Sequence, residues 1–166
     1  MSPNKLKLVK RLRIPNYNYE SRLKVQGYRL IAGVDEVGRG SWAGPVAAAA
    51  VILPQKIINK LRDSKLLLAN ERRLLARKII KEALSYAIYF ISHHQIDSLG
   101  LHQATILAYK KALKNLRVRA DFVLVDAYRI PNLSTPHLAI IKGDMKCVSI
   151  AAASIIAKVA RDNFMI

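Results

Sequence analysis

The sequence predicts an α/β fold in which a mixed β-sheet is flanked by helices. Two observations lead to this fold class. Short apolar runs of strand length alternate with longer amphipathic stretches, and the segments follow one another in the order β-β-α-β-α-β-β-α. The chain has 166 residues, which suits one domain with a sizeable core.

The first half of the chain supplies three strands and a helix. Residues 28–35 and 45–53 are apolar enough for buried strands, and the glycines between them allow a tight connection, so we expect them to pair antiparallel. Residues 70–83 place apolar side chains at helical spacing with charges between them, which predicts an amphipathic helix. Residues 84–91 are expected to form a third strand.

The second half repeats the alternation of helices and strands. Residues 96–116 carry apolar side chains at helical spacing and lysines on the late turns, where positive charge suits the helix dipole, so we expect one helix. The short apolar runs 122–126 and 137–141 predict two more strands. The alanine-rich run 148–159 predicts the last helix.

Positive charge dominates the composition. The formal net charge is +17, which indicates a polyanionic partner, with nucleic acid as the default and a membrane surface as the rival. The apolar run 42–53 is too short to span a bilayer, so we expect no membrane segment. Residues 1–25 are expected to form a basic, partly helical or disordered arm. They do not resemble a secretory signal, so a cytoplasmic location fits, while an organellar presequence stays open.

Carboxylates stand at the ends of three apolar segments, as Asp35-Glu36, Asp126 and Asp144. Ionised carboxylates about 4 Å apart repel by roughly 4 kcal/mol at an effective dielectric near 20, so a cluster needs counter-charge or shared protons. Oxygen ligands without histidine or cysteine favour Mg²⁺ or Mn²⁺. Adjacent strand residues point to opposite faces, so Asp35 and Glu36 share an ion only if the backbone leaves regular geometry, which Gly38 and Gly40 permit. The alternative is that Asp35-Glu36 is a solvated turn.

Several motifs follow one another along the chain. They are Gly33-Val34-Asp35-Glu36-Val37-Gly38-Arg39-Gly40, Ala43-Gly44-Pro45-Val46, Asp63-Ser64-Lys65, Asp126, Lys142-Gly143-Asp144 and the segment 149–162. In this order they resemble the bacterial ribonuclease HII family over roughly residues 28–165. The resemblance implies a ribonuclease H-like catalytic domain over residues 26–166. It also implies a cytoplasmic monomer that binds no membrane and acts in DNA replication and ribonucleotide excision repair.

The resemblance further implies endonucleolytic hydrolysis of RNA in RNA·DNA hybrids and at single ribonucleotides embedded in duplex DNA. The cut would fall 5′ of the ribonucleotide and leave 3′-hydroxyl and 5′-phosphate ends. The residues that would hold two Mg²⁺ or Mn²⁺ ions for this reaction are Asp35, Glu36, Asp126 and Asp144. The backbone of the loop Gly38-Arg39-Gly40 would sense the 2′-hydroxyl, because glycine lets the main chain approach the sugar closely.

Other residues are assigned more weakly by the same resemblance. Ser64 and Lys65 match a segment that would contact backbone phosphate, although Lys65 would equally suit a solvated position. Lys142 and Lys158 would neutralise phosphates or the acids, or be structural. Asp162 is expected to form a helix-stabilising pair with Lys158 or Arg161. We expect His93, His94 and His102 to lie at the surface. We expect Cys147 to be buried.

The sequence also departs from the family pattern. Leu66-Leu67-Leu68 replaces Lys-Leu-Ser, so a lysine and a helix cap worth about 1 kcal/mol are lost. Gly100 stands where the family often has an asparagine, which would weaken contact with the DNA strand. The chain stops at Ile166, before the further helical segment of the family and its sugar-packing tyrosine, so we expect a truncated sequence with weaker junction recognition.

Two other functions compete with the nuclease hypothesis. The segment from Gly38 to Ala43 imitates the dinucleotide-binding pattern G-x-G-x-x-A, but that pattern must open a helix, whereas Gly44-Pro45 and a strand follow here. The second is a non-catalytic nucleic-acid binder in which the acids are structural and the net charge supplies the affinity.

Overall fold

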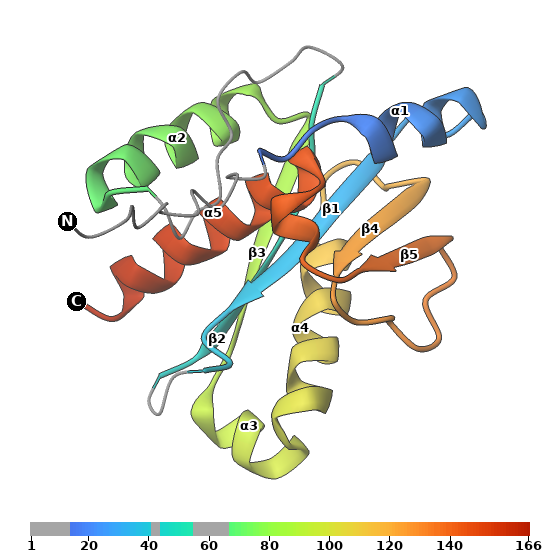
Figure 1. The fold of residues 1–166 in the computed structure, drawn as a ribbon. Coiled ribbons are helices and arrows are strands. Elements are labelled where there is room, and N and C mark those ends of the chain that lie inside the picture. The colour runs from blue at the N-terminus through green and yellow to red at the C-terminus, as the bar shows by residue number, and fades with distance from the viewer. Residues whose placement is uncertain (1–13, 41–43, 55–66) are drawn as a thin grey trace, which may run out of the picture.

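The computed structural model describes residues 14–40, 44–54 and 67–166 (Figure 1). In these residues the strands are β1 (Ile31–Val37), β2 (Val46–Ile52), β3 (Ser85–Ile91), β4 (Phe122–Asp126) and β5 (His137–Ile140). The helices are α1 (Asn18–Val25), α2 (Ala69–Glu82), α3 (His93–Leu99), α4 (Leu101–Lys114) and α5 (Val148–Phe164), with a 3₁₀ turn, η2 (Gly143–Met145), before α5.

The described strands form one mixed sheet in the order β3-β2-β1-β4-β5. β2 pairs antiparallel with β1 and with β3, whereas β4 pairs parallel with β1 and with β5. The predicted antiparallel pairing of the first two strands is confirmed. So is the predicted fold class, because helices lie against both faces of this mixed sheet (Figure 1).

Side-chain alternation along β1 divides the core into two layers. Ala32 and Val34 pack with α4 on one face of the sheet, in a cluster that includes the fully buried Tyr109. Ile31 lies on the other face with Ile150 of α5. Because successive strand residues point to opposite faces, Asp35 continues the α5 face and Glu36 continues the α4 face.

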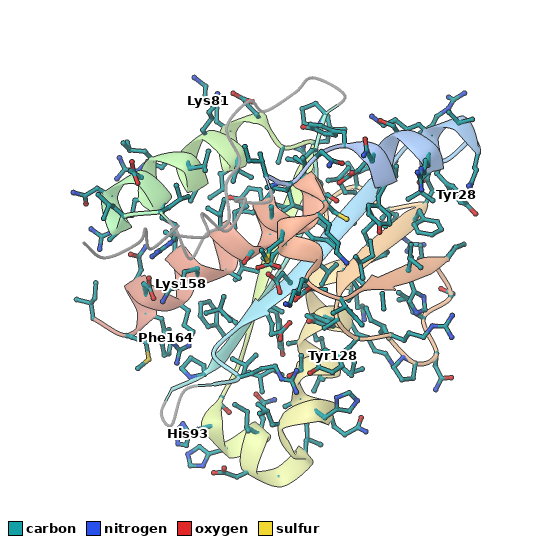
Figure 2. The ribbon with its side chains drawn as sticks, in the orientation of Figure 1. Tyr28, Lys81, His93, Tyr128, Lys158 and Phe164 are labelled. Carbon is teal, nitrogen blue, oxygen red and sulfur yellow. The ribbon has the colours of Figure 1, made fainter. Side chains whose placement is uncertain are left out.

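Residues 18–25, which the sequence placed in the basic arm, form α1 and pack against the sheet. Leu23 is buried in the cluster that contains Ile31. Just beyond α1, the ring of Tyr28 meets that of Phe122 edge-on, with centroids 4.8 Å apart (Figure 2). Residues 1–13 of the expected arm lie outside the described residues.

The single helix expected over residues 96–116 is wrong. Two helices, α3 and α4, meet at Gly100, whose φ of +77° breaks the helical path. α3 also begins earlier than expected, because the Ser92 side chain accepts a hydrogen bond from the Gln95 N–H at 3.3 Å and caps it. Other boundaries shift by a few residues: β1 runs on to Val37, and α5 runs on to Phe164.

Candidate active site

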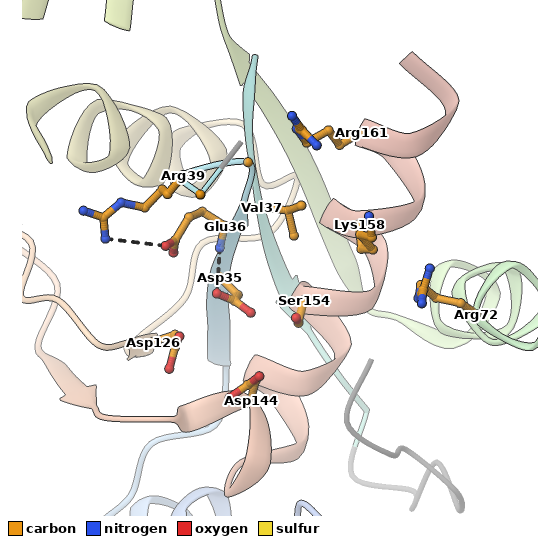
Figure 3. A pocket seen from close by; sticks show the side chains of 12 residues that line it. Asp35, Glu36, Val37, Arg39, Arg72, Asp126, Asp144, Ser154, Lys158 and Arg161 are labelled. Atoms are coloured by element: carbon orange, nitrogen blue, oxygen red, sulfur yellow. Dashed lines mark hydrogen bonds and ion pairs between the residues drawn. The ribbon is translucent and has the colours of Figure 1, made fainter. Parts of the chain in front are cut away.

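A cavity of about 350 Å³ lies at the carboxyl ends of β1 and β4 (Figure 3). Its wall contains all four acids that the sequence assigned, and it also contains cationic side chains from α2 and α5. The lining residues are Asp35, Glu36, Val37, Gly38, Arg39, Gly40, Arg72, Asp126, Asp144, Ser154, Lys158 and Arg161. Five separate elements, β1, α2, β4, η2 and α5, and the loop after β1 therefore meet in one place.

Asp35 is the more buried of the two acids on β1, with 4% of its surface exposed. Its Oδ1 accepts the N–H of Glu36 at 2.7 Å, and its carboxylate faces the hydroxyl of Ser154 on α5. Burial raises the pKa of Asp35 well above the usual value, and the charges of Glu36 and Asp126 raise it further. A neutral or cation-bound carboxyl is therefore favoured at this position over a free carboxylate.

Glu36 turns to the opposite face of β1, as the alternation requires. Its Oε2 accepts a hydrogen bond from the Tyr109 hydroxyl on α4, and its Oε1 lies 3.8 Å from the Arg39 guanidinium. Burial raises the pKa of Glu36, while the Tyr109 hydrogen bond and the Arg39 charge act against that rise. The backbone stays regular through Val37, so Asp35 and Glu36 border one cavity from two faces of the sheet.

Asp126 and Asp144 are joined through the turn that precedes α5. The N–H of Gly143 donates to Asp126 Oδ1 at 2.6 Å, across 17 residues of sequence. Lys142 adopts a left-handed conformation with φ of +56°, which turns the chain from β5 into η2. Asp144 is 5% exposed. The end of β4 and the start of η2 thus hold these two acids on the same side of the cavity.

The loop after β1 begins with a residue that has to be glycine. Gly38 has φ of +113°, and a Cβ there would lie 2.7 Å from the Pro45 carbonyl oxygen and from Arg161 Nε. Those two atoms are hydrogen-bonded to each other, since Arg161 Nε donates to the Pro45 carbonyl oxygen at 2.9 Å. The loop is therefore fixed between β2 and α5 where it enters the cavity.

Arg39 lies across this loop. Its guanidinium stacks 4.4 Å from the ring centroid of Tyr128, which is labelled in Figure 2, while its Nε is buried without a hydrogen-bond partner in the described part of the chain. Its contact with Glu36 places a positive charge among the acids. Arg39 therefore offsets part of the negative charge of the cluster.

Cations from α2 and α5 form the opposite wall of the cavity (Figure 3). Lys158 Nζ donates to Asp162 Oδ1 at 2.6 Å, which confirms the predicted helical pair. Arg72 of α2 approaches the same Asp162 at 3.5 Å, so one carboxylate joins α2 to α5. The result is a site with acids on one side and Arg or Lys side chains on the other.

The chemistry of the donor set fits hard divalent cations, because the acids supply only oxygen. Among the described residues, however, no three His, Cys, Asp or Glu side chains stand close enough to hold one ion in this arrangement. The reason lies in their present partners: Glu36 is turned toward Tyr109 and Arg39, and Asp126 accepts from Gly143.

Most sequence-assigned residues meet at the cavity, and several partners were not foreseen. The four acids and the Gly38-Arg39-Gly40 loop line it together, whereas Ser64 and Lys65 lie outside the described residues. The histidines expected at the surface are exposed, and Cys147 is buried. Sequence reasoning missed Arg72, Tyr109 and the role of Ser154. Only Tyr109 carried a signal, which is a hydroxyl placed in an apolar helix stripe.

Comparison with solved structures first defines the class of protein. Ribonuclease H2 from Pyrococcus horikoshii OT3 superimposes with a TM-score of 0.73 at 29% identity, over 82% of this chain and 74% of that one. Ribonuclease HII from Archaeoglobus fulgidus, solved in a complex with PCNA, gives a TM-score of 0.69 at 27% identity, over 82% and 75%. The protein is thus a hydrolase with the ribonuclease H-like fold.

Sequence comparison narrows the class to one family. A model of the ribonuclease HII family matches residues 32–166. Ribonuclease HII from Caldicellulosiruptor bescii is 49% identical over 151 residues, which cover 90% of this chain and 73% of that protein. The protein from Roseiflexus castenholzii is 48% identical over 157 residues, with 91% and 70% covered. The chain belongs to the ribonuclease HII family.

Membership in this family establishes the general activity. The protein is a divalent-metal-dependent endoribonuclease that acts on RNA–DNA hybrids. The dinucleotide-binding alternative is excluded, since strand β2, and not a helix, follows the glycine loop. Among the described helices, none is both long and apolar enough to cross a bilayer.

Proposed function

We propose that this chain also cleaves duplex DNA at single embedded ribonucleotides, 5′ of the ribonucleotide, and leaves 3′-hydroxyl and 5′-phosphate ends. The observation that carries the proposal is the cavity that combines four carboxylates, a glycine loop and a cationic wall. Selective hydrolysis of one phosphodiester needs three parts. They are metal ions held by carboxylates at the reacting phosphate, a contact that distinguishes ribose from deoxyribose, and cationic side chains that hold the flanking backbone.

Asp35, Glu36, Asp126 and Asp144 would hold the catalytic ions, Mg²⁺ or Mn²⁺. Bound in pairs, such ions would activate the attacking water and stabilise the leaving 3′ oxygen. The raised pKa values of Asp35 and Glu36 support this role, because crowded carboxylates gain most from a cation nearby. Tyr109 and Arg39 would orient Glu36, and Ser154 would orient Asp35.

The backbone of Gly38, Arg39 and Gly40 would contact the 2′-hydroxyl of the ribonucleotide. The left-handed backbone at Gly38 supports close approach of the main chain to a sugar, and Arg161 keeps the loop in place. The hydroxyl is the feature that separates RNA from DNA at a single position. Selection of one ribonucleotide within a DNA duplex would follow from this contact.

Arg72, Lys158 and Arg161 would bind backbone phosphates on either side of the cut, with Ser64 and Lys65 as further phosphate contacts. Phosphate contacts fix the register of a duplex without reading its sequence. We propose further that the protein works as a cytoplasmic monomer in replication and ribonucleotide excision repair. The net charge of +17 supports a nucleic-acid duplex as its partner.

A nicking assay tests this proposal. A labelled DNA duplex with one ribonucleotide would be incubated with Mg²⁺ or Mn²⁺ and with the wild type or Asp126→Asn. We expect one nick 5′ of the ribonucleotide by the wild type, and a rate at least about 100-fold lower for Asp126→Asn, since even partners of metal ligands contribute 10- to 100-fold. An all-DNA duplex and an RNA–DNA hybrid serve as substrate controls.

The outcomes separate the alternatives. Cleavage of the hybrid without cleavage of the single-ribonucleotide duplex would limit the protein to the general activity of the family. Binding of both duplexes without metal-dependent cleavage by the wild type would favour the non-catalytic binder. A product with a 5′-hydroxyl end would contradict the proposed 3′-hydroxyl and 5′-phosphate ends.

A further inference from the structure

The segment that precedes the family match closes over the start of α5. Asn16 forms a parallel bridge with Cys147, and its N–H donates to the Lys146 carbonyl at 3.2 Å. α1 begins two residues later, and its Glu20 reaches the same junction from 129 residues away in the sequence. The family model begins only at residue 32, so Asn16 and Glu20 lie outside that match, whereas their partners at the start of α5 lie inside it.

Glu20 acts as the N-terminal cap of α5. Its Oε1 accepts both the N–H of Ser149, at 2.9 Å, and the hydroxyl of Ser149, at 2.7 Å. Within the described chain, the local cap residue Cys147 makes no side-chain hydrogen bond to the helix. The first N–H groups of a helix lack partners inside it and favour negative charge. A carboxylate from α1 therefore replaces the usual local cap.

Glu20 holds this position at a cost in free energy. It is 4% exposed, and its Oε2 has no hydrogen-bond partner among the described residues. A buried carboxylate with an unsatisfied oxygen loses hydration that is not returned. A neutral local cap would avoid this loss.

The capped turn lies directly against β1. A Cβ on Gly33 would stand 2.1 Å from the carbonyl carbon of Ser149, so only glycine allows this approach. Gly33 and Asp35 share one face of β1. Ser154, further along α5, contacts Asp35 from that side. The position of the first turn of α5 therefore sets the position of Ser154 on Asp35.

The same junction also fixes Asp144. The N–H of Cys147 donates to the Gly143 carbonyl at 2.8 Å, and the N–H of Lys146 donates to it at 2.9 Å. The turn that carries Asp144 is thus bonded to the residues that Asn16 and Glu20 hold. Asp144, and Ser154 that contacts Asp35, are therefore both positioned by one junction.

We propose that Glu20 is a positioning residue of the active site: by capping α5 from α1, it seats the Ser149 turn on Gly33 and thereby places Ser154 and Asp144 relative to Asp35. This inference rests on the proposed function, because it takes the acids to be the catalytic groups. Glu20 touches no reacting atom and acts only through Ser149.

Kinetics and hydrogen exchange test this role. We expect Glu20→Ala to lower kcat about tenfold with KM within about twofold, the scale at which supporting contacts act on metal sites. Glu20→Gln keeps an acceptor for Ser149 and should recover most of kcat. Glu82→Gln, an exposed glutamate on α2, is the matched control and should not change either constant. Assays belong at a temperature at which urea unfolding shows every variant folded.

Amide exchange separates failure of this inference from failure of the proposed function. Faster exchange at Ser149 and Asp144 in folded Glu20→Ala is the expected result, and it needs no cleavage. If the wild type does not nick the duplex, the proposed function fails. Unchanged exchange in Glu20→Ala would overturn the positioning role, whatever the result of the nicking assay. A kcat loss in Glu20→Ala that follows only the unfolded fraction would also overturn it.

Discussion

At the scale of single residues, Asp35 is the acid of the site whose ionisation is most unfavourable in the folded state. It is almost fully buried, Glu36 and Asp126 repel its charge, and only the Ser154 hydroxyl and the Glu36 N–H oppose these effects. A group whose pKa is raised on folding binds more protons in the folded state. The contribution of Asp35 to stability is therefore lost as the pH rises from the ordinary Asp pKa of the unfolded state toward the raised pKa of the folded state.

We therefore predict that Asp35→Asn stabilises the protein in the presence of a chelator. The free energy of unfolding at pH 7 should rise by about 1–2 kcal/mol, the usual gain when a strained functional residue is replaced. The gain should shrink toward zero below about pH 3, where the carboxyl is largely protonated in both states. Urea unfolding across this pH range measures the effect.

Asp97→Asn supplies the control for that measurement, because it removes the same charge from an exposed position on α3. It should change the free energy of unfolding by less than about 0.5 kcal/mol. Added Mg²⁺ should stabilise the wild type more than Asp35→Asn. A loss of stability in Asp35→Asn at pH 7 would show that the folded state compensates the buried charge.

At the scale of elements, helix α2 begins without its usual cap. Leu68 occupies the N-cap position in extended conformation, with 73% of its surface exposed, and its N–H donates to Glu71 Oε2 at 2.9 Å. This is one half of a capping box, because a leucine side chain has no oxygen to accept the N–H of Glu71 in return. The helix starts within one residue of the predicted position even so.

Leu68→Ser should complete the capping box and raise the free energy of unfolding by about 1 kcal/mol. Little apolar burial is lost, because Leu68 is largely exposed. Leu74→Ser, at a 65% exposed position inside α2, is the matched control and should lower stability by a few tenths of a kcal/mol through helix propensity. Thermal unfolding monitored by circular dichroism measures both. Equal effects of the two serines would contradict the capping explanation.

Periodicity predicted the elements more completely than it predicted the contacts between them. The buried strands and the last helix were found to within a few residues, because their apolar patterns are continuous. The break at Gly100 was missed, since the apolar spacing runs across it. Glu20 and Tyr109 were missed as partners of Ser149 and Glu36, because these contacts join residues 129 and 73 positions apart. Such contacts follow from the packing of α1 and α4, which local sequence does not encode.

At the scale of the whole molecule, charge is distributed unevenly around the cavity. Four of the eleven acidic residues of the chain line it, and three Arg or Lys side chains from α2 and α5 stand on the other wall. A phosphate backbone would be repelled by the acids alone and drawn to the cations. The balance therefore directs the backbone along the cationic wall and leaves divalent ions for the acids.

This distribution predicts that Lys158→Gln weakens duplex binding and reduces its salt dependence. Each lost phosphate contact lowers the slope of log K against log salt concentration by about one, whatever the sequence of the duplex. Fluorescence anisotropy with Asp126→Asn as the parent protein prevents cleavage during the titration. Lys78→Gln is the matched control, because Lys78 is half exposed on α2, 4.0 Å from Glu82, and does not border the cavity. An equal loss of slope in both variants would show that binding depends on net charge alone, and an unchanged slope in Lys158→Gln would remove Lys158 from the phosphate path.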